Sequence, residues 1–319
     1  MSQYLDRVFA IEAVRVTEAA AIGASRQIGR GDEHQADHAA VEAMRTAFNQ
    51  LPIDGTVVIG EGERDEAPML YIGEKVGSGG VRVDIALDPL EGTTLTAKAL
   101  PNALAVMAIA EPGTLLNAPD TYMDKIAIGG GYAEGVIDLD ATPEENIRSL
   151  AKAKGVPPHE ITALILDRPR HAHIIEGVRK TGAAVRLITD GDVAGVIATT
   201  DPTTGIDIYM GQGGAPEGVL AAAALRCVGG QIQTRLVFKK EDEKARAAKL
   251  GITDFNRKYK LMDLASGDVI FAATGVTDGS MLSGVHMDRE FIHTESIVMR
   301  SATGTVRTVR ARTRRERIG

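Results

Sequence analysis

Acidic residues stand at the ends of predicted strands, where α/β proteins commonly place their chemistry. Asp88 and Glu91 enclose Pro89-Leu90 directly after the strand expected over residues 81–87. Glu61 lies in a glycine turn after the strand expected over residues 56–59, and Asp37 opens the second predicted helix behind a Gly-rich turn. Carboxylates that share a partly buried site repel one another and raise each other's pKa. Such a group therefore needs positive charge close by.

Few Lys or Arg residues stand beside these acids in the sequence. Bound Mg²⁺ or Mn²⁺ would supply the missing charge, since hard cations prefer oxygen ligands. Simpler roles compete at two positions: Asp37 is equally well explained as a helix cap, and Glu63 is better explained as a turn former. No structural need accounts for Asp88 and Glu91 together, so the sequence predicts a divalent-metal site.

Composition excludes several other functions. The 319 residues carry 36 basic and 43 acidic side chains, a net charge of -7 that argues against a polyanion binder. Aromatic residues make up 4% and Trp is absent, which disfavours stacking on bases or glycans. The single cysteine, Cys227, excludes a disulfide framework and is expected to be a buried thiol.

The polar N-terminus lacks the apolar stretch of a signal peptide, and no segment approaches the roughly 20 apolar residues of a membrane span. We therefore expect a cytoplasmic protein that binds neither membrane nor nucleic acid. The Arg-rich residues 307–317 could be a binding tail, but a solvated edge strand with a frayed end explains them better.

The residue pattern predicts helices over 5–24 and, with Val41, Met44 and Phe48 on one face, over the segment that follows the first turn. The strict alternation of residues 81–87 predicts a strand with one face in the core. Residues 103–110 predict a further strand, and the glycines within residues 125–139 predict a hairpin.

A second region begins after a predicted linker at residues 156–158. Thr142 and Glu145 form the capping box of the helix before it, which Gly155 ends. Beyond the linker, strands over 161–166, 185–189 and 206–210 alternate with helices, as in an α/β lobe. We predict two layered α/β lobes, residues 1–157 and 158–319, with the active site between them. The pattern does not tell which sheet the C-terminal strands join.

The segment Asp88-Pro89-Leu90-Glu91-Gly92-Thr93 resembles the metal motif of the inositol-monophosphatase and fructose-bisphosphatase superfamily, with Glu91 in place of the second Asp. That replacement is similar to the class II fructose-1,6-bisphosphatases. Further segments resemble the same family in its order: Gly29-Arg30-Gly31-Asp32, Ile59-Gly60-Glu61-Gly62-Glu63, Asn117-Ala118-Pro119-Asp120, Pro169-Arg170-His171, Asp190-Gly191-Asp192 and Gly213-Gly214-Ala215-Pro216-Glu217-Gly218.

The resemblance implies an α-β-α-β-α sandwich and the Mg²⁺- or Mn²⁺-dependent hydrolysis of the 1-phosphate of fructose-1,6-bisphosphate. Some members of the family also act on sedoheptulose-1,7-bisphosphate, which makes it the second expected substrate. It implies a homo-oligomer, dimer or tetramer. The implied metal ligands are Asp37, Glu61, Asp88, Glu91 and Glu217. Glu61, Asp88 and Thr93 would be catalytic. The implied substrate-binding residues are Glu91, Gly92, Thr93, Tyr122, Arg170, His171, Ala172, Asp190, Gly191, Asp192 and Gly214.

Two other functions compete with this interpretation. The glycines of residues 211–218 superficially resemble the dinucleotide turn of an NAD(P)-binding oxidoreductase. Glu217 would repel a pyrophosphate there, and no acid for the ribose follows. A non-catalytic sugar-phosphate sensor would not need Thr93. One departure from the family also matters: Glu33-His34 stands where relatives commonly carry Lys-Asn, so the metal preference of this chain can differ.

Overall fold

The computed structural model describes residues 5, 7–62 and 68–317. The chain forms two compact units: Met1–Leu115 with Gly267–Gly319, and Leu116–Ser266. Each unit contains a mixed sheet with helices, which confirms the predicted α/β class. The predicted stacking of both lobes into one five-layer sandwich stays a prediction. In the described part of the chain, no helix has both the length and the apolar character of a membrane span.

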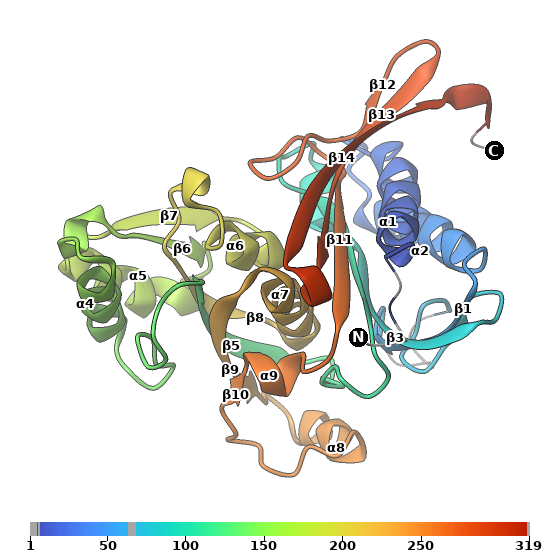
Figure 1. Ribbon diagram of the computed structural model, residues 1–319. Coiled ribbons are helices and arrows are strands. Elements are labelled where there is room, and N and C mark those ends of the chain that lie inside the picture. Colours follow the sequence, from blue (N-terminus) through green and yellow to red (C-terminus); the bar gives the residue numbers. More distant parts are fainter. Residues whose placement is uncertain (1–4, 6, 63–67, 318–319) are drawn as a thin grey trace. The chain divides into compact units, whose positions relative to one another are not determined.

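The first unit is built on a sheet with the strand order β12-β13-β11-β4-β3-β1-β2, and β14 pairs with β13 (Figure 1). Its strands are β1 (Ile53–Ile59), β2 (Lys75–Val76), β3 (Val81–Glu91), β4 (Leu104–Ala110), β11 (Val269–Gly275), β12 (His286–Met287), β13 (Phe291–Arg300) and β14 (Thr305–Arg314). Its helices are α1 (Phe9–Ser25), α2 (Glu33–Phe48) and α3 (Thr93–Ala97).

Helix α1 packs on the sheet, and α2 packs on α1. Small residues allow this close approach: a Cβ atom at Gly23 would lie 2.5 Å from the backbone oxygen of Ala39. Val41, Met44 and Phe48 are buried on one face of α2, as their spacing predicted. The packed pair of helices therefore fixes α2, the helix that carries Asp37.

Strand β3 differs from its prediction. It is buried on both faces from Val83 to Leu87, whereas the alternation predicted one solvated face. Ala86 occupies a position that the pattern assigned to the polar face. Asp84 is buried because its Oδ2 accepts a 2.6 Å hydrogen bond from the Gly113 backbone N–H, which offsets the loss of water. The strand also runs on to Glu91 instead of ending before Asp88.

The second unit is built on a sheet with the strand order β10-β9-β5-β8-β6-β7. Its strands are β5 (Tyr122–Gly129), β6 (Thr162–Leu166), β7 (Ala184–Ile188), β8 (Ile208–Gly214), β9 (Gly230–Val237) and β10 (Tyr259–Lys260). Its helices are α4 (Pro143–Lys154), α5 (Ala172–Lys180), α6 (Asp192–Ala198), α7 (Ala215–Val228), α8 (Glu241–Lys249) and α9 (Leu261–Leu264). The chain also makes short 3-10 helices at Pro158–Glu160, Pro169–His171, Pro202–Thr204, Ser301–Thr303 and Arg315–Arg317.

Helices α4 and α5 bury their apolar sides against one face of this sheet. Helices α6 and α7 pack beside each other and against β5 and β8 (Figure 1). The alternation of strand and helix after residue 160 is confirmed, with β7, β6 and β8 parallel in the order β7-β6-β8. The capping box of Thr142 with Glu145, and the left-handed Gly155 at the other end of α4, are confirmed as well.

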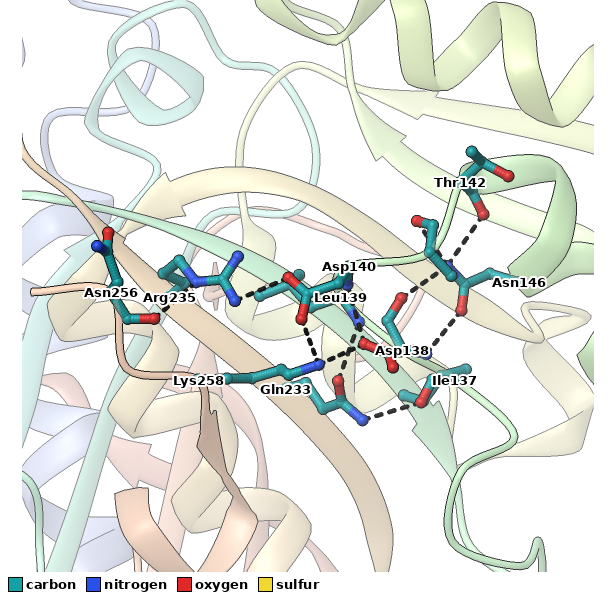
Figure 2. A network of polar contacts seen from close by, with 11 residues as sticks. Ile137, Asp138, Leu139, Asp140, Thr142, Asn146, Gln233, Arg235, Asn256 and Lys258 are labelled. Atoms are coloured by element: carbon teal, nitrogen blue, oxygen red, sulfur yellow. Dashed lines mark hydrogen bonds and ion pairs between the residues drawn. The ribbon is translucent and has the colours of Figure 1, made fainter.

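The hairpin predicted over residues 125–139 is wrong. Strand β5 pairs antiparallel with β8 and with β9, so both of its edges are taken by strands that come later in the chain. The segment after β5 is held by side chains instead (Figure 2). Gln233 accepts a 2.9 Å hydrogen bond from Leu139 N–H and donates a 2.8 Å bond to the Ile137 carbonyl. Lys258 forms ion pairs with Asp138 and Asp140 of that segment, at 2.5 and 2.6 Å.

The C-terminal strands return to the sheet of the first unit. Strand β11 pairs with β4 along its whole length, and β13 pairs with β11. The chain therefore passes between the units at residues 115–116 and 266–267, and these positions differ from the predicted boundary at 157–158. Residues 156–157 lead into a short helix, Pro158–Glu160, inside the second unit. The Arg-rich strand β14 lies at the exposed edge of its sheet, as predicted.

Candidate active site

Two parallel strand ends bring acids to one edge of the first sheet. Strands β1 and β3 run parallel with Ile59 opposite Ala86. Two residues beyond this pair, the chain reaches Glu61 on one strand and Asp88 on the other. The register of the sheet therefore places these two carboxylates at the same edge, although they stand 27 positions apart in the sequence. Glu63, in the same turn, lies outside the described residues.

The Asp-Pro-Leu-Glu segment forms an irregularity in the pairing of β3 with β4. The register shifts between Asp88 and Glu91. Pro89 has no N–H to give to the ladder, and the Leu90 N–H donates a 3.0 Å hydrogen bond to Asp88 Oδ1 instead. Gly92 follows with φ 98°, a left-handed conformation that glycine adopts without strain. The chain can then turn into α3, whose first residue is the half-buried Thr93.

The turn before α2 is tied to α3 by backbone hydrogen bonds. Gly29 N–H donates to the Thr96 carbonyl and Gly31 N–H donates to the Ala97 carbonyl, both at 2.9 Å. Asp32 caps α2 by accepting a 3.0 Å bond from Gln35 N–H. Asp37 therefore does not open the helix, as expected from the sequence, but lies one turn inside it. The cap explanation for Asp37 is wrong, because Asp32 fills that role.

Burial makes Asp37 and Glu61 unusually reluctant to ionise. Burial, and to a lesser extent the charge of Asp37, raises the pKa of the Glu61 carboxyl to about 8. Burial also raises the pKa of Asp37, while His34 and His38 lower it by less. No Lys or Arg in the described ranges acts on the Glu61 pKa. Two desolvated carboxylates whose charge these histidines offset only in part are what an oxygen-coordinated cation would satisfy.

The predicted metal ligands are not gathered into one compact group. Among residues 5, 7–62 and 68–317, no three acidic, His or Cys side chains approach closely enough to hold an ion. The structure thus links Asp37 with Glu61 through their charges and places Asp88 at the same sheet edge. Glu91 is buried at the end of β3. Glu217 belongs to the second unit and has neighbours of its own.

Glu217 lies in the first turn of α7, beside Asp192 and Lys125. The pKa of Glu217 is raised to about 7, because burial and the charge of Asp192 raise it by more than Lys125 lowers it. Lys125 forms a buried ion pair with Asp192, the first residue of α6. Gly191, with φ 89°, is the N-cap of α6. The loop that carries Asp190 is thereby anchored at its helical end.

The glycines at the end of β8 make room for these acids. A Cβ atom at Gly213 would lie 2.0 Å from Asp192 Oδ2, and one at Gly214 would lie 1.9 Å from Glu217 Oε2. The glycine-rich segment therefore admits two carboxylates to the backbone. A pyrophosphate would be repelled there, so the dinucleotide interpretation loses its support.

Arg170 is fixed by the backbone of β8. Its Nε and Nη2 both donate to the Gln212 carbonyl, at 3.2 and 2.6 Å. The guanidinium carbon lies 5.1 Å from the ring centre of the half-exposed Tyr122, and Lys239 Nζ lies 3.7 Å from the same ring. Two cations beside one tyrosine form a positive surface that suits a phosphate ester. Arg170 also lines a cavity of about 210 Å³ with Gln212 and Arg235.

The His171 ring is buried and both of its nitrogens are engaged. Its Nδ1 lies 2.7 Å from the Leu166 carbonyl, and its Nε2 accepts a 2.9 Å bond from Gln212 N–H. Nδ1 therefore carries the proton and donates it. Burial lowers the pKa of this imidazole, which favours the neutral ring. His171 thus joins β6 to β8 next to Arg170, while Ala172 is exposed as the first residue of α5.

Sequence reasoning missed Lys125, Gln212 and Lys239. Lys125 directly precedes the apolar residues 126–128, which is a local signal of a paired buried charge, but the glycines that follow favour a hairpin there. Gln212 acts through its backbone, where residue type carries no signal. Lys239 reaches Tyr122 from the loop after β9, and that contact depends on strand pairing alone.

These features define an α/β protein with acids at one sheet edge and a basic surface for an anionic ester. Comparison with known proteins gives the family. The chain matches bacterial fructose-1,6-bisphosphatase, glpX-encoded, over residues 7–313. It is 46% identical to fructose-1,6-bisphosphatase 1 class 2 of Escherichia coli K12, over 96% of this chain and 95% of that protein. The class 2 enzymes of Escherichia coli O6:H1 and Shigella flexneri show the same identity and coverage. The chain belongs to the class 2 fructose-1,6-bisphosphatases, a family of phosphoric monoester hydrolases.

The raised pKa of Glu61 makes a prediction about stability without metal. The folded carboxyl, with a pKa of about 8, keeps its proton over a range where the unfolded one, near the ordinary 4.5, has lost it. The contribution of Glu61 to the free energy of unfolding is therefore fully present below about pH 4.5. It falls as the pH rises and is lost once the pH has passed through 8. Glu61→Gln should remove this loss and be more stable than the parent at alkaline pH, by on the order of a few kcal/mol.

Urea unfolding in EDTA at acidic and alkaline pH measures the difference. The matched control is Glu134→Gln, because that side chain is 89% exposed. The control should unfold like the parent at both values. Parallel pH dependences for Glu61→Gln and the parent would contradict the assignment.

Proposed function

We propose that this chain hydrolyses the 1-phosphate of fructose-1,6-bisphosphate to fructose-6-phosphate and inorganic phosphate, with Mg²⁺ or Mn²⁺ as cofactor. Its membership of the class 2 family supports the reaction. The observation that carries the metal proposal is the pair of desolvated carboxylates Asp37 and Glu61. Burial and the charge of Asp37 raise the pKa of Glu61, and no Lys or Arg in the described ranges lowers it.

The donor chemistry fits a hard divalent cation. We assign Asp37, Glu61, Asp88 and Glu91 of the first unit, and Glu217 of the second, as the residues that would hold it. When bound, such an ion supplies positive charge to the phosphoryl oxygens and activates water for attack. The predicted position of the active site between the two lobes stays a prediction.

The residues of the chain would divide the remaining work. Thr93, at the start of α3, offers a hydroxyl to orient the attacking water, with Glu61 as the group that takes its proton. Asp88 and Glu91 stand on either side of the irregularity in β3, which turns this segment out of the regular ladder.

The second unit would bind the sugar phosphate. Arg170 is preorganised by two hydrogen bonds to one carbonyl and would bind the phosphate that is not cleaved, next to Tyr122. Asp190 and Asp192 would accept hydrogen bonds from sugar hydroxyls, with Gly191 and Gly214 allowing close approach of the backbone. Ala172 and His171 would complete the wall beside Arg170.

Metal-ligand variants test the proposal directly. Asp88→Ala and Glu91→Ala should each lower kcat by about a thousandfold or more, because a lost ligand removes charge stabilisation that only the transition state uses. Phosphate release from fructose-1,6-bisphosphate is measured with Mn²⁺ or Mg²⁺ and again with EDTA. Glu134→Ala is the control and should keep full activity. Full activity of either ligand variant, or parental activity in EDTA, would refute the metal assignment.

Arg170→Lys tests the phosphate site. Lys keeps the charge but loses the planar fork that both grips Gln212 and faces the substrate. We expect KM for fructose-1,6-bisphosphate to rise about tenfold, with a smaller change in kcat. Arg179→Lys, on the far turn of α5, is the matched control. An unchanged KM in Arg170→Lys would remove Arg170 from the binding site.

Sedoheptulose-1,7-bisphosphate is the second substrate that we propose, because the assigned contacts involve a phosphate and hydroxyls that both sugars share. Parallel assays should show hydrolysis of both bisphosphates by one preparation, and both activities should fall together in Asp88→Ala. We also propose a homo-oligomer, a dimer or a tetramer, which light scattering measures. A monomer, or hydrolysis of the fructose ester alone, would contradict these two points.

A further inference from the structure

Lys125 is a lysine in the middle of a sheet. It lies on β5, between β8 and β9, opposite Gly211 on one side and Thr234 on the other. Its side chain is 1% exposed. A buried ammonium loses its hydration, a cost of several kcal/mol that only close acidic partners offset. The position of Lys125 therefore calls for an explanation from its neighbours.

Two acids from different helices serve as these neighbours. Asp192, at the start of α6, forms the ion pair with Lys125 Nζ and is itself buried. Glu217, in the first turn of α7, is close enough for Lys125 to lower its pKa. Its Oε2 is buried and accepts no hydrogen bond from any described residue. One fixed cation thus faces two carboxylates at the end of β8.

Three glycines lie directly against Lys125 and its two acids. A Cβ atom at Gly213 would lie 3.2 Å from Lys125 Nζ as well as 2.0 Å from Asp192 Oδ2. At Gly218, a Cβ atom would lie 3.2 Å from Lys125 Cε and 2.6 Å from Met123 Sδ. Gly214 leaves space for Glu217 in the same way. At this strand end, the side chains of Lys125 and its two acids therefore occupy the space that Cβ atoms would take at the three glycines.

We propose that Lys125 is a positioning residue for the phosphatase reaction: its ammonium holds Asp192, and with it the Asp190–Asp192 loop, in the conformation that binds the sugar. The inference rests on the proposed role of that loop in substrate binding. Lys125 does not touch the reacting atoms. It acts through Asp192, whose carboxylate it keeps in place beside β8.

Stability alone does not explain this pair. Replacing a buried ion pair by well-packed apolar side chains is often neutral or stabilising, so a fold that needed only a core would have a Met or Leu here. The ammonium also has no access to solvent here, because the Lys125 side chain is 1% exposed. The charge is instead directed at the two acids assigned to the sugar and the cation.

The experiment compares Lys125→Met, Asp192→Asn and the double variant in the full-length enzyme. Lys125→Met should raise KM for fructose-1,6-bisphosphate about tenfold with kcat changed less than about threefold. Asp192→Asn should raise KM as well. The double variant should raise KM no more than the larger single effect, because both changes break one pair. Lys125→Arg keeps the charge and should lie closer to the parent than Lys125→Met.

Lys154→Met is the matched control. It removes another lysine of the second unit, which pairs with Asp207 at 2.5 Å away from the assigned residues, and should leave KM and kcat unchanged. An unchanged KM in folded Lys125→Met, with a raised KM in Asp192→Asn, overturns the positioning role and leaves the proposed function intact. An unchanged KM in Asp192→Asn removes the loop from the substrate site and this inference with it. Multiplicative effects in the double variant also overturn it.

Should Lys125→Met fail to fold, Gly213→Ala gives an independent test. It adds one methyl group against Asp192 Oδ2 and changes no charge. Displacement of the Asp192 carboxylate should raise KM by about the same factor as Asp192→Asn. The melting temperature checks that the variant is folded. A folded Gly213→Ala enzyme with parental KM would overturn the proposal.

Discussion

Repulsion between buried carboxylates is the constraint on which the site in the first unit depends. Burial raises the pKa of both Asp37 and Glu61, and the charge of Asp37 adds to the effect on Glu61. Elements distant in sequence create this situation: α2, packed on α1, supplies one acid and the end of β1 supplies the other. The fold holds these acids together at a cost, and the cost is lowered when a cation binds. The packing that holds the two carboxylates together therefore contributes to the affinity for the cation.

The second unit meets the same problem with a cation of its own. Lys125 is a residue of β5, so this cation cannot dissociate as a metal ion can. It interacts with both Asp192 and Glu217. The total charge of these three groups, when all are ionised, is one negative unit. That leaves Glu217 only partly balanced, as its raised pKa of about 7 reflects. Lys125 thus anchors Asp192, the acid assigned to the sugar. Glu217, the acid assigned to the metal, remains only partly balanced by positive charge.

The sequence predicted what local chemistry controls. The capping box of α4, the apolar face of α2 and the strand end before Glu61 follow from residue type and spacing, and all three are present. Strand β3 differs, because it runs past Asp88 to Glu91. The hairpin after Lys125 failed because strand pairing is non-local: nothing in residues 125–139 tells that β8 and β9 occupy both edges of β5. The unit boundary differed for the same reason, since β11 returns to β4 across more than 150 residues.

The glycines of residues 211–218 show why a motif needs its physical context. In a dinucleotide turn, glycines let the backbone approach a pyrophosphate at a helix N-terminus. Here the same residue type lets two carboxylates approach the backbone, at Gly213 and Gly214. The local requirement, space without a Cβ atom, is identical, but the charge that fills the space is carried by the protein. Because Glu217 occupies the first turn of α7, an anionic ligand cannot use that helix end directly, whereas a cation beside Glu217 would reconcile the two.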